Sequence, residues 1–132
     1  MEGEPSPTAN GRHTMRQKKS TDYRESLVFT DLVNELPVVR EATTSRVVLN
    51  NEILRVVLFS FDAGQLLTEH SSPRAVIVQM LDGKIEFTVG GETTVLTDGD
   101  IIYLAPGERH ALTALEPSHM ALTLVDAAGV SQ

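Results

Sequence analysis

The sequence predicts an all-β fold, an antiparallel sandwich or barrel in a single domain. After residue 37, about eight short apolar runs are separated by Gly, Pro, Asp or Asn, with turn signals every ~8–12 positions. No long stretch has the apolar periodicity of an amphipathic helix. A chain of 132 residues has room for one hydrophobic core, which can be stable without disulfides or a structural metal.

The N-terminal segment differs from the rest in composition. Residues 1–24 are rich in Pro, Ser, Thr, Gly, Asn and charge, so they cannot bury enough apolar surface to offset the entropy lost on ordering. We therefore predict a disordered tail over 1–24, a folded domain over 25–127 and a frayed C-terminus over 128–132. Met15 precedes a basic run and is an alternative candidate for the translation start.

One short helical element is expected before the strands. Leu32, Val33 and Leu36 recur at helical spacing, Thr30 is a suitable N-cap, and Pro37 ends the run. This pattern predicts a short helix or turn over about 31–36.

The strand region contains two hairpin signals. Residues 46–61 hold two β-branched runs separated by an Asn-Asn pair at 50–51, and residues 84–96 hold an alternating strand followed by a Gly-Gly turn at 90–91. The remaining expected strands are residues 65–70, 75–81, 101–105, 109–115 and 119–125.

Composition and charge exclude several function classes. The chain has no cysteine, so disulfides, thiolate metal ligands and cysteine nucleophiles are ruled out. Residues 25–132 carry a net charge of −9 against +2 for residues 1–24. An acidic body of this kind is repelled by phosphate backbones, so we expect no nucleic-acid partner.

Membrane association and export are not indicated either. No run approaches the ~18 consecutive apolar residues of a membrane span, and the N-terminus lacks the apolar region of a signal peptide. We therefore expect no membrane partner and a cytoplasmic location.

Two segments resemble the paired motifs of the cupin superfamily. Five residues separate Gly64 from His70 in the first, and Gly99 is followed by Pro106-Gly107 and His110 in the second. The resemblance implies a cupin-type double-stranded β-helix, also called a jelly-roll barrel, in a small single-domain protein of the conserved-barrel, RmlC-like type. It extends over roughly residues 27–125.

The ligand positions depart from the family pattern. The resemblance implies a set of metal ligands of which this sequence retains two, His70 and His110, while the second histidine and the glutamate of the family fall on Ser72 and Val76. Two imidazoles are too few for a closed metal site. A divalent metal such as Zn, Ni, Mn or Fe would need a third ligand from elsewhere.

Strand alternation suggests the other pocket residues. Thr68, His70 and Ser72 would share one face of their strand, with Glu69 on the other face unless a bulge reorients it. Met80 would share the pocket face of the next strand. Together with the two histidines, the predicted ligand-binding set is His70, His110, Ser72, Thr68, Met80 and Tyr103. Tyr103 would bind through its hydroxyl group, and packing of its ring is the alternative.

Other polar residues have simpler expected roles. His119 is expected to be an ordinary strand-end histidine, and Asp98 and Asp100 to build a turn around Gly99. Arg74 and Arg109 could clamp a carboxylate ligand.

Three functions remain open at this point. The first is a barrel that binds a small organic ligand or anion, with a weak divalent metal at His70 and His110 as an option. The second is a divalent-metal-dependent enzyme of the isomerase, dioxygenase or lyase type, and the third is a non-catalytic dimerising barrel. In each case we expect a homodimer formed through the apolar faces of strands 53–61 and 119–125.

Overall fold

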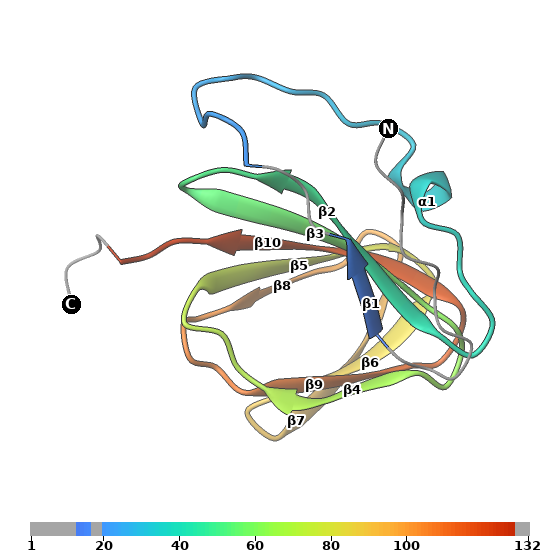
Figure 1. Cartoon of the computed structure of the whole chain (residues 1–132). Coiled ribbons are helices and arrows are strands. Elements are labelled where there is room, and N and C mark those ends of the chain that lie inside the picture. The colour runs from blue at the N-terminus through green and yellow to red at the C-terminus, as the bar shows by residue number, and fades with distance from the viewer. Residues whose placement is uncertain (1–12, 17–19, 129–132) are drawn as a thin grey trace.

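The computed structural model describes residues 13–16 and 20–128, with side chains described from residue 20 onward. One short helix and a series of strands make up this part of the chain (Figure 1). Their bounds are β1 (His13–Arg16), α1 (Leu32–Glu35), β2 (Thr43–Asn50), β3 (Leu54–Phe61), β4 (Leu66–His70), β5 (Ala75–Asp82), β6 (Lys84–Val89), β7 (Glu92–Thr97), β8 (Ile101–Leu104), β9 (His110–Ala114) and β10 (Ser118–Val125).

The strands form two sheets that face each other around the core (Figure 1). The larger sheet has the order β1-β2-β3-β10-β5-β8, and the smaller has the order β4-β9-β6-β7. Pairing is antiparallel throughout except between β1 and β2, which are parallel. The predicted all-β barrel is confirmed.

The predicted tail contains a strand. Within residues 1–24, β1 pairs with β2, and the backbone N–H of Thr21 donates to the carbonyl of Asn50 at 2.7 Å. Pairing with an open strand edge uses backbone groups alone, so it needs no apolar pattern in the added segment. Residues 1–12, 17–19 and 129–132 lie outside the described residues, and disorder there stays a prediction.

The helix is one turn long and falls within the expected range. Its N-cap is Asp31, with φ 58°, and not Thr30 as predicted. Asp31 makes no side-chain bond to the helix backbone; its Oδ1 instead accepts from the side-chain amide of Asn34 at 2.7 Å. The left-handed backbone at Asp31 sets where the turn starts, and Asp is one of the residues that tolerate this conformation.

Both predicted hairpins are present. Asn51 closes the β2–β3 turn because its Oδ1 accepts from the backbone N–H groups of Ile53 and Leu54. Gly90 and Gly91 connect β6 to β7 with φ of 58° and 83°, the pair of positive values that a tight type I′ turn requires.

The core lies between the two sheets. Phe59 and Phe61 stack with ring centroids 5.7 Å apart. Apolar side chains from both sheets pack with them inside the barrel: Val47, Val57, Val76, Val78, Met80, Ile85, Phe87, Leu96, Leu104, Leu112, Ala114 and Met120. These side chains fill the space between the two sheets.

We predict that Gly83→Ala strongly destabilises the fold. Gly83 has φ +98°, and a Cβ there would lie 2.6 Å from the carbonyl oxygen of Pro117, in a turn that backbone atoms enclose. Strain at such a φ costs about 1–3 kcal/mol, and the clash adds to this cost. Chemical denaturation should therefore show a loss above about 3 kcal/mol in the free energy of unfolding.

The matched control is Gly99→Ala. Gly99 has φ +87° but no atom within 4 Å of the added Cβ, so only the backbone strain should appear. Equal losses in the two variants would contradict the role of the close contact at Gly83.

Candidate functional site

Two histidines meet at one end of the barrel. His70 is the last residue of β4 and His110 the first residue of β9, and the two face each other in the β4–β9 register. Their ring centroids are 4.2 Å apart in an edge-to-face arrangement. His110 is buried and His70 is exposed, so the pair reaches from the core to the surface.

A β-bulge places His70 on this face. The β4–β9 register shifts between Leu67 and His70, so Leu67 pairs with Leu112 and His70 with His110. Residues 67 and 70 thereby face the same side, although strict alternation would place them on opposite sides. Strict alternation across the bulge, on which the expected grouping of Thr68 with His70 depended, therefore does not hold.

Hydrogen bonds determine the tautomer of both rings. Nδ1 of His70 lies 2.8 Å from the carbonyl oxygen of Thr68, and Nδ1 of His110 lies 3.0 Å from that of Glu108. A carbonyl oxygen only accepts, so each Nδ1 carries the proton and donates it. In the neutral form of either ring, the lone pair is therefore on Nε2.

His110 is held in the neutral form. Burial lowers its pKa below the ordinary histidine value because it penalises the charged ring, and the neighbouring His70 lowers it further. The bond to the Glu108 carbonyl and the Glu108 charge oppose this shift without reversing it. The ring also stacks on Phe87, with an interplanar angle of 12°.

Among residues 20–128, no hydrogen bond or ring contact joins the side chain of Ser72, Met80, Tyr103 or Thr68 to either histidine, so their part in ligand binding stays a prediction. The Ser72 hydroxyl accepts from the backbone N–H of Arg74, and Met80 is buried in the core at 1% exposure. Tyr103 is 64% exposed on the outer face of β8, because Ile102 and Leu104 take the inner face. Thr68 is exposed and contributes its carbonyl group only.

The arginines and turn aspartates have separate partners. Arg109 forms an ion pair with Glu69 at 3.0 Å, while Arg74 lines a cavity that neither histidine lines. Asp98 accepts from the Gly83 N–H and Asp100 from the Thr97 N–H, which matches their expected turn roles.

His119 has a structural role that the sequence did not reveal. It is 6% exposed, and its Nδ1 and Nε2 lie 2.8 Å from Asp82 Oδ1 and 2.7 Å from the Leu36 carbonyl oxygen. These bonds join the segment before β2 to the outer face of β10. The Leu36 carbonyl is 83 positions away in the chain, so no local pattern could indicate it.

The histidine pair alone does not complete a metal site. Throughout the part of the chain that the structure describes, no group of three or more His, Cys, Asp or Glu side chains could hold a metal ion. The two Nε2 atoms supply fewer protein donors than the three that catalytic zinc and non-haem iron sites use.

Comparison with known proteins gives the family. A family model described as "Cupin domain" matches residues 57–126, which include both histidines of the site. The chain belongs to the cupin family. No curated protein matches this cupin, and no helix among its described residues is long and apolar enough to cross a membrane.

Solved structures agree with this cupin barrel. A conserved protein of unknown function from Streptococcus pyogenes is 31% identical, with a TM-score of 0.71 over 84% of this chain and 97% of that one. KdgF from a Halomonas species is 27% identical, with a TM-score of 0.61 over 63% and 79%. A cupin superfamily protein from Desulfitobacterium hafniense, 17% identical with a TM-score of 0.70 over 83% and 97%, supports the fold alone.

We predict that His110 makes stability fall under acidic conditions. Its pKa is lower in the folded chain than the ordinary value of about 6.5, so the unfolded chain binds the proton more readily. The contribution of neutral His110 to the free energy of unfolding should therefore be fully present above about pH 6.5 and should be lost progressively as the pH falls below that value. Urea denaturation from pH 8 to pH 5.5 should show a smaller decrease for His110→Gln than for the wild type; parallel curves would refute the assignment.

Proposed function

We propose that this cupin binds a small organic ligand at the barrel end through the Nε2 atoms of His70 and His110. The observation that carries the proposal is the shared hydrogen-bond arrangement, in which both Nδ1 atoms donate to backbone carbonyls. Within residues 20–128, neither Nε2 atom has a hydrogen-bonding partner. Two neighbouring acceptors are therefore available to one ligand.

The chemistry of the acceptors favours hydroxyl or ammonium groups on the ligand. A neutral imidazole with its proton on Nδ1 accepts at Nε2, so it pairs with a donor. An anion would require protonated rings, which the burial of His110 opposes. The net charge of −7 also repels anions at long range.

A weak divalent metal is the second candidate at the same atoms. Metal-binding histidines usually donate their other ring N–H to a carbonyl or carboxylate, which is the arrangement of both rings here. The protein would supply two nitrogens, and water or the ligand would fill the remaining positions. A metal-dependent enzymatic activity would require that a metal binds at these two nitrogens.

Binding can be tested with imidazole nitrogen spectra. We expect a panel of monosaccharides and amino alcohols to contain a compound that shifts the Nε2 resonances of His70 and His110. The variant His70→Ala/His110→Ala should bind that compound at least about tenfold more weakly, because it lacks both acceptors. Thr68→Val is the control, since it keeps the carbonyl that orients His70.

The same proteins separate the two candidates. Untagged wild-type protein purified without chelator is analysed for metal by mass spectrometry, beside the double histidine variant. Metal near one equivalent in the wild type alone would favour the metal site over direct ligand binding. If the purified protein contains no metal and no compound changes the Nε2 resonances, both the ligand-binding proposal and the metal-binding proposal are contradicted.

We also propose a homodimer through the outer face of the six-stranded sheet. The interface was expected on β3 and β10, but Leu58 of β3 and Ala121 of β10 are buried within the described chain itself. The exposed apolar side chains Ile101 and Tyr103 lie instead on β8, at the edge of the same sheet. Burying these two side chains between copies would remove apolar surface from water.

The dimer can be tested by sedimentation at micromolar concentration. Tyr103→Glu should dissociate it to a 14.4 kDa species, because an unpaired carboxylate in the interface is costly. Val95→Glu changes an exposed apolar residue of β7 in the other sheet and should leave the dimer intact. A wild type that sediments only as the monomer would overturn the proposal.

A further inference from the structure

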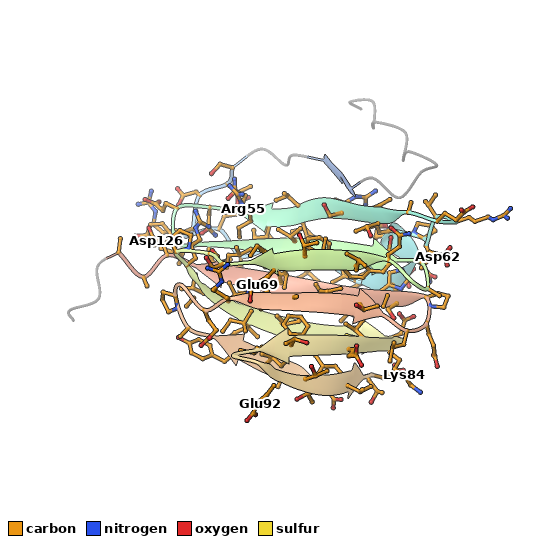
Figure 2. The ribbon with its side chains drawn as sticks, turned by 90° about the horizontal axis from the view of Figure 1, so that it is seen from below. Arg55, Asp62, Glu69, Lys84, Glu92 and Asp126 are labelled. Atoms are coloured by element: carbon orange, nitrogen blue, oxygen red, sulfur yellow. The ribbon has the colours of Figure 1, made fainter. Side chains whose placement is uncertain are left out.

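A surface cavity has a lining that includes neither His70 nor His110. It has a volume of about 420 Å³ and is lined by Pro73, Arg74, Pro106, Asp126, Ala127 and Ala128. These residues come from the β4–β5 loop, the β8–β9 loop and the segment after β10. Figure 2 shows Asp126 at the end of the barrel where Arg55 and Glu69 also lie, opposite the end with Asp62 and Lys84.

The cavity contains two opposite charges that are not paired with each other. No ion pair within 4.0 Å joins Arg74 to Asp126, or either of them to another residue of the described chain. Arg109 contrasts with Arg74, because its guanidinium is already bound to Glu69. Proline and alanine side chains form the rest of the lining. The cavity thus offers a cationic group, an anionic group and an apolar surface.

The loop that carries Arg74 is held in place before any ligand arrives. The Gly107 N–H donates to the Ser72 carbonyl at 2.7 Å, which joins the two loops on either side of the cavity. The Arg74 N–H donates to the Ser72 hydroxyl at 3.1 Å. Proline in each loop restricts the backbone further. Little conformational entropy is therefore lost from this wall on binding.

Asp126 is also oriented by its own backbone contacts. Its N–H donates to the Ile53 carbonyl at 3.0 Å, and its Oδ1 accepts from the Ala128 N–H at 2.9 Å. Oδ2 has no such bond in the described residues and can accept from a ligand.

We propose that this cavity binds a small zwitterion, with the ligand carboxylate on Arg74 and the ligand ammonium on Asp126. An arginine fork suits a carboxylate, and a free carboxylate oxygen suits an ammonium group. A zwitterion has no net charge, so the acidic protein does not repel it as it would repel a simple anion. The volume falls within the usual range for small-ligand sites, about 300–1,000 Å³.

The test uses ω-amino acids of increasing length with single-charge analogues. Glycine, β-alanine, 4-aminobutanoate and 6-aminohexanoate are titrated into the full chain, and the amide signals of Arg74, Ala127 and Ala128 are followed by NMR. We expect one chain length to bind best and to shift these signals. Butanoate and butylammonium should bind at least about tenfold more weakly, because each lacks one charge-assisted hydrogen bond.

Variants assign the two charges. Arg74→Gln and Asp126→Asn should each weaken binding of the best amino acid by about tenfold, since each removes one charged partner. Arg55→Gln is the control, because Arg55 lies at the same end of the barrel without lining the cavity (Figure 2). Binding of butanoate as tight as that of the amino acid, an equal loss in Arg55→Gln, or no shift with any compound would each overturn the proposal. Variants of His70 and His110 should leave this binding unchanged, which separates its outcome from that of the histidine site.

Discussion

The backbone pairing of β10 holds the larger sheet together. This strand pairs with β3 over Ser118–Val125 on one side and with β5 over His119–Val125 on the other. It is central in space although it is the last strand in sequence. One face supplies Met120 to the core, and the other carries His119, whose two bonds fix the segment before β2. The larger sheet, the core and the position of the segment before β2 therefore all depend on one strand.

The histidine site depends on irregularity in the smaller sheet. If β4 alternated strictly, Leu67 and His70 would point to opposite sides, and one of them would leave the core face. The bulge lets Leu67 contribute to the core while His70 joins His110. The carbonyl of Thr68, the first residue after Leu67, also orients the His70 ring. The same local distortion thus sets both the position of the ring and the location of its lone pair.

The sequence predicts the fold well because its turn residues and alternation are explicit. The Gly-Gly pair at 90–91 has the positive φ values that its hairpin needs, and the alternating strand before it buries Ile85 and Phe87 in the core. The two histidines of the site also follow from motif spacing. The side of β8 on which Tyr103 lies cannot be predicted in this way. Every residue of β8 is apolar or aromatic, so the sequence does not indicate which alternate residues face the core. The bulge and the partners of His119 depend on contacts between distant segments, which no local pattern encodes.

The late position of β10 in the chain has a consequence during synthesis. The ribosome releases β3 and β5 before β10, so the two edges that β10 later joins remain unpaired until that strand emerges. Because such contacts are distant in sequence, their formation is slow compared with that of the β6–β7 hairpin. An incomplete nascent chain therefore exposes two strand edges with apolar side chains, the kind of surface that chaperones bind and that neighbouring nascent chains can join.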